Sequence, residues 1–320
     1  MGKEIKIINL DDVEVKEVAW LWKPYIPFGK LTIVQGDPGE GKTTFVLRLA
    51  AMLTLGKCFS CDEEMVDVEP MNVIYQTAED GLADTVKPRL LAAGADCTKV
   101  LVIDESDKSL SMDDERLEIA LKMTGAKLLI LDPLQAYLGE RVDMNRANEA
   151  REMTKKLGAL AERTGCAIIL VGHMNKGSGS KAAYRGIGSI DFFAIARSVL
   201  LVARTPEDST VRAIAQIKNN LATEGGTMAF RLDEVRGFEW IGQYDISTDE
   251  LLSGYTNSDK RKTAEEFLKK ILANGKAVPA SSIFAQAKAL GVSKRTIENV
   301  KMELNIKSVK EGNIWLWKMN

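Results

Sequence analysis

Hydrophobic residues in the first 173 positions alternate between short continuous runs and runs at helical spacing. The continuous runs predict strands at 31–34, 71–76, 100–104, 127–132 and 167–173. The helically spaced residues predict helices at 45–53, 82–93, 115–121 and 145–164. The strands are apolar almost throughout, as in sheets that helices cover on both faces. We therefore expect an α/β fold with a mainly parallel sheet and right-handed crossovers.

The pattern changes after residue 173. Residues 174–189 are rich in glycine, serine and basic residues, and a short helix is expected at 191–196. Four strands are then expected in quick succession, at 198–202, 211–217, 228–232 and 238–244. The gaps between them are too short for crossover helices, so hairpins should form an antiparallel extension at the edge of the sheet.

A polar stretch at 248–261 has the composition of a linker and precedes a small domain at 262–320. Helices are expected there at 263–272 and 281–290, and a third begins after Ser293, which is a good N-cap. A hairpin should end the chain, and three helices with a hairpin predict a winged helix. Trp315 and Trp317 alternate on its last strand, so they share a face and at least one should belong to the core.

Composition excludes several classes of protein. No apolar run approaches a membrane span, and the charged N-terminus lacks the apolar stretch of a signal peptide, so we expect a cytoplasmic protein with no membrane partner. His173 is the only histidine, which excludes a multi-histidine metal site. Cys58 and Cys61 form a Cys-x-x-Cys pair, but a second pair is missing, so we expect reduced cysteines rather than a zinc site.

The net charge of −2 conceals an asymmetry. Residues 262–320 hold ten lysines and one arginine against five glutamates, a net +6 that leaves −8 for the rest. A basic tail suggests a module that faces nucleic acid, and a solvated lysine-rich surface is the alternative. The third helix of a winged helix usually enters the major groove, although such domains also dock proteins. The candidate DNA-binding residues are Lys294, Arg295 and Lys301, with Lys307 and Lys310 on the wing.

Residues 36–44 fit the phosphate-binding pattern Gly-x-x-x-x-Gly-Lys-Thr. An apolar strand leads into this P-loop and a helix leads out, so backbone N–H groups and the helix N-terminus can surround an anion. Lys42 would supply charge to the β and γ phosphates, and Thr43 would complete a Mg²⁺ shell. We expect ATP and Mg²⁺ as ligands, bound by Gly36, Asp37, Pro38, Gly39, Glu40, Gly41, Lys42, Thr43 and Thr44.

Three further residues end predicted strands at the same edge of the sheet, where the nucleotide crevice of such folds lies. Asp132 follows an apolar strand as a Walker B aspartate does, and would hold Mg²⁺ opposite Thr43. Glu79 would polarise the attacking water, while the alternative, capping of a helix, is the role we expect for Asp80. His173 would bind the γ phosphate and report its loss, or be merely structural.

The loop after His173 carries Lys176, Lys181 and Arg185 among glycines and serines. A basic loop of this kind suits a polyanion, because charge rather than shape holds a phosphate backbone. A plain solvated loop is the alternative. The two lysines, Lys176 and Lys181, are therefore candidate DNA-binding residues.

The order of the motifs resembles that of a known family. In sequence they are Pro27-Phe28-Gly29-Lys30, the P-loop, Ala78-Glu79-Asp80, Leu131-Asp132-Pro133-Leu134, Gly172-His173-Met174-Asn175-Lys176, Arg185-Gly186 and Ala196-Arg197-Ser198. They resemble the RepA-like ATPases, a branch of the RecA and DnaB superfamily that includes a hexameric plasmid replicative helicase. The resemblance covers residues 15–245 and implies a RecA-like ATPase domain at 1–247.

The resemblance also implies a homo-oligomeric ring, expected to be hexameric, with ATP sites between subunits. Glu79 would be the catalytic glutamate, His173 the sensor and Arg89 a supporting arginine. A basic residue of the neighbouring subunit would stabilise charge as an arginine finger does. The candidates are Arg185, Arg197, for which a buried structural role is the alternative, and Lys218. Related ring helicases often carry Lys-x-Arg here, whereas this chain reads Lys218-Asn219-Asn220.

These expectations combine into a Mg²⁺-dependent ATPase that acts on DNA. We expect a replicative helicase of a plasmid, phage or other mobile element, with single-stranded DNA in a central channel. A recombination or repair ATPase that forms filaments is one alternative. Another is a regulator without motor activity, which would use nucleotide as a switch and bind one DNA site through its winged helix.

Overall fold

The computed structural model describes residues 7–59, 65–138, 147–173, 190–233, 237–253, 257–275, 277–311 and 314–319. The chain divides into two compact units. The large unit comprises Met1–Ala203 and Ala213–Tyr244, and the small unit comprises Arg204–Arg212 and Asp245–Asn320. None of the helices described here has both the length and the apolar character needed to span a membrane.

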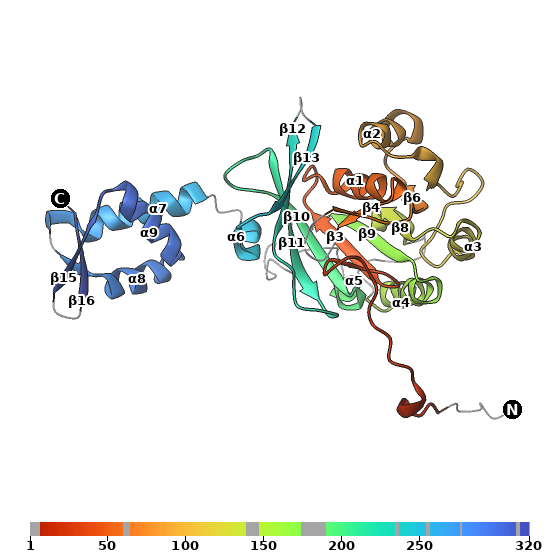
Figure 1. Cartoon of the computed structure of the whole chain (residues 1–320), viewed down its shortest axis with the longest axis horizontal. Coiled ribbons are helices and arrows are strands. Elements are labelled where there is room, and N and C mark those ends of the chain that lie inside the picture. The colour runs from red at the N-terminus through yellow and green to blue at the C-terminus, as the bar shows by residue number, and fades with distance from the viewer. Residues whose placement is uncertain are drawn as a thin grey trace. The chain divides into compact units, whose positions relative to one another are not determined.

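In the part of the chain that is described, a sheet of nine strands forms the centre of the large unit, in the order β13-β12-β11-β10-β3-β9-β8-β6-β7 (Figure 1). In chain order the strands are β3 (Leu31–Gly36), β6 (Val73–Thr77), β7 (Val100–Leu101), β8 (Leu128–Asp132), β9 (Ala167–His173), β10 (Ser198–Arg204), β11 (Val211–Asn219), β12 (Met228–Asp233) and β13 (Gly237–Gln243). The pairs from β10 to β7 are all parallel, and β12 pairs antiparallel with β13. A mainly parallel sheet with an antiparallel edge extension is confirmed.

β10 joins the two parts of the sheet. On one side it pairs in parallel with β3, because α5 (Ile190–Ile195) separates it from β9 in the chain. On the other side it begins the hairpin series as expected, since the N–H of Asn220, just after β11, donates to the carbonyl of Arg197, just before β10.

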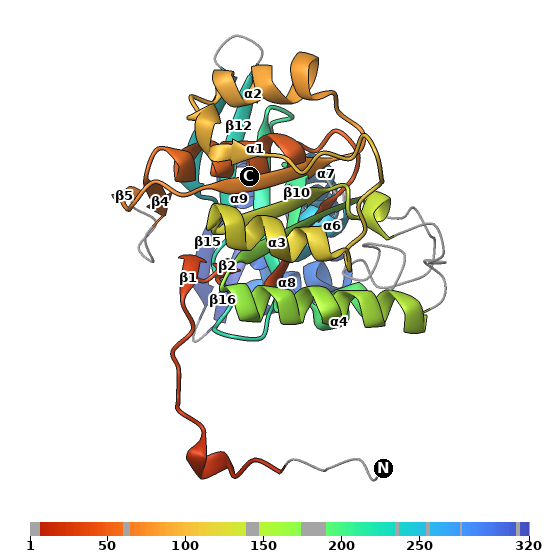
Figure 2. The same cartoon turned by 90° about the vertical axis from the view of Figure 1, so that its right-hand side faces the viewer.

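Helices cover both faces of the sheet, as Figures 1 and 2 show. α1 (Lys42–Thr54) and α2 (Lys87–Ala92) pack on one face, and α3 (Glu115–Thr124), α4 (Ala147–Thr164) and α5 pack on the other. Side chains along β8 point alternately to the two faces of the sheet. Leu128 and Ile130 belong to the core on the α1 face, whereas Leu129 and Leu131 belong to the core on the face covered by α3, α4 and α5. Burial on both faces explains why the strands are apolar throughout.

Shorter elements complete the large unit. Two small antiparallel ribbons pair β1 (Trp20–Trp22) with β2 (Ile26–Pro27) and β4 (Lys57–Phe59) with β5 (Met65–Asp67). Short helical turns lie at Leu10–Asp12, Cys97–Lys99 and Leu134–Tyr137. The helix expected at 82–93 begins as a π-helical turn, Leu82–Val86, and becomes α-helical at Lys87. Pro88 lies at the junction, in the first turn of α2.

The small unit builds its own core from helices and a three-stranded antiparallel sheet. Its helices are α6 (Thr248–Ser253), α7 (Asn257–Ile271), a short turn at Ala273–Gly275, α8 (Ala280–Ala289) and α9 (Lys294–Glu303). Its strands are β14 (Val278–Pro279), β15 (Lys307–Glu311) and β16 (Ile314–Lys318), in the order β14-β16-β15. Ser293 caps α9 as expected, its Oγ accepting from the N–H of Thr296 at 3.1 Å. The range expected to be a linker holds α6 and the start of α7.

Candidate active site

The P-loop connects β3 to α1 at the carboxyl edge of the parallel sheet. Glycine is required at its two ends for different reasons. A Cβ on Gly36 would lie 2.1 Å from the carbonyl oxygen of Val202. Gly41 has a φ of 90°, and a Cβ there would lie 2.9 Å from Leu232 Cδ1. No side chain caps the first turn of α1 in the described structure, so its N–H groups are available to an anion.

Lys42 reaches back over this loop from the first turn of α1. Its ammonium donates to the carbonyl oxygens of Gly36 at 2.9 Å and Asp37 at 2.8 Å, and the residue is only 4% exposed. Burial lowers the pKa of Lys42, and nearby carboxylates, led by that of Asp132, oppose the shift. A buried ammonium held by two loop carbonyls is positioned to exchange them for phosphate oxygens.

Thr43 and Asp132 meet across the crevice. The Thr43 hydroxyl donates to Oδ2 of Asp132 at 2.8 Å, and the Tyr75 hydroxyl donates to the same oxygen at 3.1 Å. Asp132 is 7% exposed, and burial raises its pKa while the two hydroxyls and Lys42 oppose that shift. Hydroxyl and carboxylate oxygens are the ligands that Mg²⁺ prefers, so this pair fits the metal of a nucleotide complex.

The metal would depend on the nucleotide as well as on the protein. Within the described residues, no group of three or more His, Cys, Asp or Glu side chains could hold a metal ion. Mg²⁺ in phosphoryl-transfer sites usually keeps several waters and binds phosphate oxygens, with only one or two protein ligands. The donor set here, one hydroxyl beside one carboxylate, matches that pattern.

Tyr75 was not anticipated. An aromatic residue in an apolar strand reads as core, and the ring of Tyr75 is indeed buried in the α1 core. Burial and the Asp132 carboxylate both raise the pKa of its hydroxyl, so Tyr75 remains a donor. The sequence signal that could have identified Tyr75 was its hydroxyl, because a buried tyrosine hydroxyl usually has a hydrogen-bond partner.

Glu79 and Asp80, the acidic pair after β6, have different surroundings. Glu79 is exposed and lies close enough to interact electrostatically with both Lys42 and Asp132. Asp80 does not cap the following helix: its Oδ2 accepts from Arg89 Nη1 at 2.8 Å, and Gly81 at the N-cap has no side chain to offer. The capping expected of Asp80 is therefore wrong, and Arg89 is engaged by Asp80 in this structure.

His173 and Gln35 place unpaired polar atoms beside the P-loop. His173 ends β9 directly opposite Gly36 in the parallel register, and its Nδ1 is buried without a hydrogen-bond partner. Gln35, the residue before Gly36, is fully buried, and neither its amide nitrogen nor its oxygen has a partner. A buried unpaired polar atom is costly, which fits an edge of the sheet that completes its bonds with a ligand. Gln35 was missed, although a polar residue in an apolar strand was its signal.

Two of the three candidates for action in trans, Arg197 and Lys218, lie near the end of the sheet opposite the P-loop. Arg197 is exposed, which excludes a buried structural arginine, and its N–H donates to the carbonyl of Leu31, where β3 begins. The Lys218 ammonium donates to the carbonyls of Phe193 and Ala194 at 2.6 and 3.0 Å, and burial lowers its pKa. Leu31 is five residues before Gly36 on β3, about 17 Å at 3.3 Å per residue.

The remaining candidates are less defined. Lys176, Lys181 and Arg185 lie outside the described residues. Lys294 and Lys301 lie on α9, as does Arg295, whose side chain is also outside the description.

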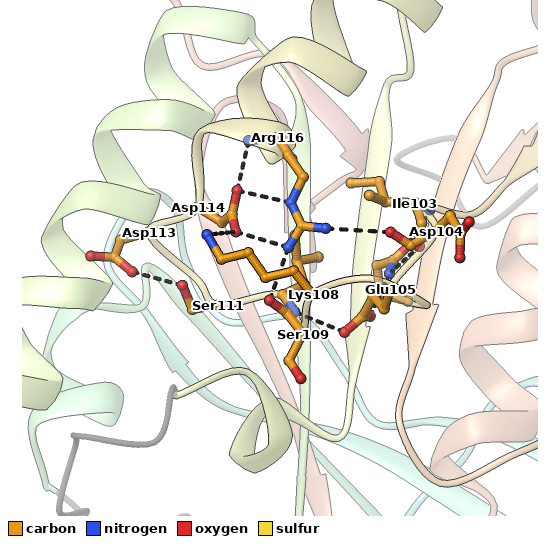
Figure 3. Close-up of polar contacts among 11 residues, drawn as sticks. Ile103, Asp104, Glu105, Lys108, Ser109, Ser111, Asp113, Asp114 and Arg116 are labelled. Atoms are coloured by element: carbon orange, nitrogen blue, oxygen red, sulfur yellow. Dashed lines mark hydrogen bonds and ion pairs between the residues drawn. The ribbon is translucent and has the colours of Figure 1, made fainter.

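A polar clamp fixes the loop at 102–114 against the sheet, and Figure 3 shows its centre. The guanidinium of Arg116 donates to both carboxylate oxygens of Asp114 and to the carbonyl oxygens of Asp104 and Ser109. Asp114 also caps α3 by accepting from the Arg116 N–H at 2.9 Å. β7 ends at Leu101, three residues earlier than expected, and the carbonyl of Asp104 accepts from Arg116 rather than from a strand.

The same loop carries Glu105 to the central sheet. Glu105 accepts from the side chain of Gln76 at 2.9 Å and from the N–H of Leu110 at 2.8 Å. Gln76 lies on β6 next to Tyr75, so the clamp supports the strand that delivers Tyr75 to the site. A contact of this kind depends on tertiary structure and has no local sequence signal.

Comparisons with known proteins agree with this geometry. Residues 4–179, more than half of the chain, match the family model described as an AAA domain. The DNA repair protein RadA of Halalkalibacterium halodurans is 26% identical over 252 residues, which are 77% of this chain and 49% of that protein. RadA of Streptococcus pneumoniae is 24% identical over 284 residues, 88% of this chain and 60% of that protein. The chain thus spans about half the length of the curated relatives it matches.

A solved structure shows the same fold. The crystal structure of the KaiC-like protein PH0186 from Pyrococcus horikoshii OT3 aligns with a TM-score of 0.50 and 18% identity, over 71% of this chain and 100% of that one. At this identity the likeness concerns the fold alone. The chain therefore belongs to the AAA domain family, and its large unit has a RecA-like P-loop fold.

Proposed function

We propose that this protein hydrolyses ATP with Mg²⁺ and couples the reaction to DNA. The observation that carries the proposal is the bond between Thr43 and Asp132, which brings the P-loop hydroxyl onto the strand-end carboxylate across 89 residues of sequence. Beside it lie a buried ammonium and an uncapped helix N-terminus. This combination of donors and acceptors suits a triphosphate with its metal.

Each residue has a defined task in this proposal. The amides of the P-loop hold the β and γ phosphates, and Lys42 turns from the loop carbonyls to phosphate oxygens. Thr43 and Asp132 would hold Mg²⁺, which would neutralise charge that develops on the phosphates. Glu79 orients the attacking water and accepts its proton, and His173 donates a hydrogen bond to the γ phosphate.

We further propose that a neighbouring copy completes the site. Arg197 is level with Leu31, about 17 Å along β3 from Gly36 of its own chain, and the Lys218 ammonium donates to carbonyls of α5 near the same end of the sheet. A copy that presents this edge to the next P-loop would bring one of them to the γ phosphate. This supports an oligomer, and a hexameric ring is the form we propose.

For the biological role, DNA recombination or repair is the candidate we favour. The names of the two relatives, both DNA repair protein RadA, support it. A replicative helicase of a mobile element, with single-stranded DNA in a central channel and Lys176 and Lys181 on its wall, is the second candidate. The order of motifs from the P-loop to Arg197 supports that alternative.

The small domain at 262–320 is proposed to be a winged helix that binds DNA. Its three helices, its hairpin and its net charge of +6 support this assignment.

ATP hydrolysis with and without single-stranded DNA tests the proposal. Lys42→Ala should abolish both the basal and the DNA-stimulated rate. Lys127→Ala is a matched control, because Lys127 is exposed and precedes β8 at the end opposite Asp132. Hydrolysis by Lys42→Ala at the wild-type rate would overturn the proposed site. If wild-type protein hydrolyses ATP but DNA does not raise the rate, the proposed ATPase activity stands and the proposed coupling to DNA is overturned.

A further inference from the structure

The small unit carries a surface on which lysines alternate with aromatic rings. We name it the lysine–aromatic strip, and its residues are Phe284, Lys294, Lys301, Lys310, Trp315 and Trp317. Each lysine ammonium lies over one ring: Lys294 over Phe284 at 5.0 Å, Lys301 over Trp317 at 4.6 Å and Lys310 over Trp315 at 5.8 Å from the centroid. Cation–π attraction therefore holds three cations along one surface.

The strip is continuous from α8 across α9 to the hairpin. Phe284 and Trp317 meet edge to face, with centroids 5.3 Å apart. Lys294 and Lys301 are seven positions apart on α9, so they share a face of that helix. Lys301 also donates to Ser308 Oγ at 2.6 Å, which ties α9 to β15.

The two tryptophans place the strip partly in the core and partly in solvent. Trp315 and Trp317 point to the same face of β16, where they lie opposite Lys310 and Ser308 of β15. Trp317 is 4% exposed and belongs to the core, whereas Trp315 is 54% exposed. The fold needs Trp317 for packing, but nothing in the described core requires an indole at position 315.

Both carboxylates of α9 are paired. Glu298 lies one turn from Lys294, with Lys294 Nζ 3.9 Å from its Oε1, and Glu303 pairs with Arg261 at 2.9 Å. The charge of Lys294 is therefore partly offset by a neighbouring carboxylate, whereas Lys310 and Trp315 lie on the hairpin.

We propose that the lysine–aromatic strip binds single-stranded nucleic acid. An unpaired base stacks on the exposed face of Trp315, and backbone phosphates contact the ammonium groups of Lys294, Lys301 and Lys310. An exposed aromatic ring beside cations is the combination that recognises single strands, because every base has a π-face and stacking needs the base to be free of its partner. The proposal rests on the proposed DNA partner, but it is independent of ATP hydrolysis.

The test uses the full chain without nucleotide and measures fluorescence anisotropy of a labelled oligothymidylate of about 15 nucleotides and of a duplex of equal length. Wild-type protein should bind the single strand more tightly than the duplex. Trp315→Ala should weaken single-strand binding about tenfold, and Trp315→Phe should recover most of it because a π-face is restored. Lys310→Ala should lower the slope of log affinity against log salt by about 0.7.

Leu290→Ala is the matched control, since Leu290 is also an exposed large apolar residue of the small unit but lies outside the strip. Its affinity should equal that of wild type. Equal binding of Trp315→Ala and wild type, or tighter binding of the duplex, would overturn the proposal. Absence of binding would overturn it too and favour a protein-docking role.

Lys42→Ala separates this proposal from the proposed ATPase. That variant should keep the Trp315-dependent affinity, since no nucleotide is present, while it loses hydrolysis. If the strip proposal is wrong, the binding measurements will contradict it and the hydrolysis measurements will not. If the ATPase proposal is wrong, only the hydrolysis measurements will contradict it.

Discussion

Tyr75 donates a hydrogen bond of 3.1 Å to Oδ2 of Asp132, the same oxygen that accepts from Thr43. Thr43 would direct its hydroxyl oxygen to Mg²⁺ in the proposed nucleotide complex, so its bond to Asp132 would be exchanged. Tyr75 is not a metal ligand, so it can keep its hydrogen bond to the Asp132 carboxylate before and after nucleotide binds. We therefore expect Tyr75 to act as a positioning residue for the metal ligand.

Tyr75→Phe should weaken the response to Mg²⁺. The Asp132 carboxylate then loses a donor that opposes the effect of burial on its pKa, so the charged form that binds the metal becomes less favourable. We expect the Mg²⁺ concentration for half-maximal ATPase to rise about tenfold, the lower end of the 10- to 100-fold range typical of partners of metal ligands. Titration of the ATPase with Mg²⁺ at fixed ATP measures this.

Tyr25→Phe controls for the loss of a buried hydroxyl. Tyr25 donates to the carbonyl of Gly226 at 2.8 Å, away from the P-loop. This variant should lose stability of about 1 kcal/mol without a change in Mg²⁺ dependence. Equal Mg²⁺ responses of the two variants would mean that Tyr75 serves stability only.

Glu79→Gln should separate binding from hydrolysis. The amide cannot accept a proton from the attacking water, so kcat should fall at least about 100-fold, as general-base loss predicts. Affinity for MgATP should remain, because Lys42, Thr43 and Asp132 are unchanged. Rapid-quench hydrolysis and equilibrium binding of a fluorescent ATP analogue give the two quantities.

The neighbouring carboxylate provides the control for Glu79. Asp80→Asn breaks the ion pair with Arg89, which is partly exposed, and should change kcat by much less than Glu79→Gln. A larger effect at Asp80 than at Glu79 would transfer the catalytic assignment to the Asp80–Arg89 pair.

Asp114→Asn should make stability less dependent on pH in the acid range. The Arg116 guanidinium lowers the pKa of Asp114, so the carboxylate stabilises the fold at pH values above its unfolded pKa, near 3.9. That stabilisation is lost as the pH falls through the lowered, folded-state pKa. Asparagine still caps a helix, so the variant removes mainly the charge-assisted bonds to Arg116.

We expect Asp114→Asn to lower the free energy of unfolding by about 1–2 kcal/mol at pH 7 and the difference to shrink below about pH 4. Urea unfolding at several pH values measures this. Glu115→Gln, an exposed carboxylate in the next position, controls for general charge effects. A difference that grows on acidification would contradict the assigned role of Arg116.

Local sequence was sufficient for those parts of the molecule that depend on local chemistry. β8 could be placed because both of its faces are buried, so Leu128 to Leu131 form one apolar run. Lys42, Thr43 and Asp132 could be assigned because a P-loop fixes its own geometry and the end of a parallel strand faces it. The confirmed fold follows from the same two patterns.

The missed features depend on contacts between distant segments. Tyr75 acts through a hydroxyl at the end of a ring that packs like any core aromatic. Glu105 meets Gln76 only after 102–114 folds around Arg116. The charge of α9 could be counted from sequence, but the orientation of its lysines toward Phe284 and Trp317 could not.

Mixing of inactive variants should reveal whether the site is shared between copies. Lys42→Ala destroys the P-loop side, and Arg197→Ala removes a candidate from the opposite edge, so a mixed oligomer would contain interfaces with both halves intact. We expect each variant alone to lose at least about 1000-fold in kcat, as loss of an arginine finger does, and the mixture to recover a substantial fraction of the wild-type ATPase. Lys218→Ala, mixed in the same way, tests the other candidate.

A mixture of Lys42→Ala and Glu79→Gln is the control. Both changes lie on the P-loop side, so no interface with an intact P-loop half can form and activity should not return. Recovery in the control, or full activity of Arg197→Ala and Lys218→Ala alone, would show that neither residue completes a neighbour's site.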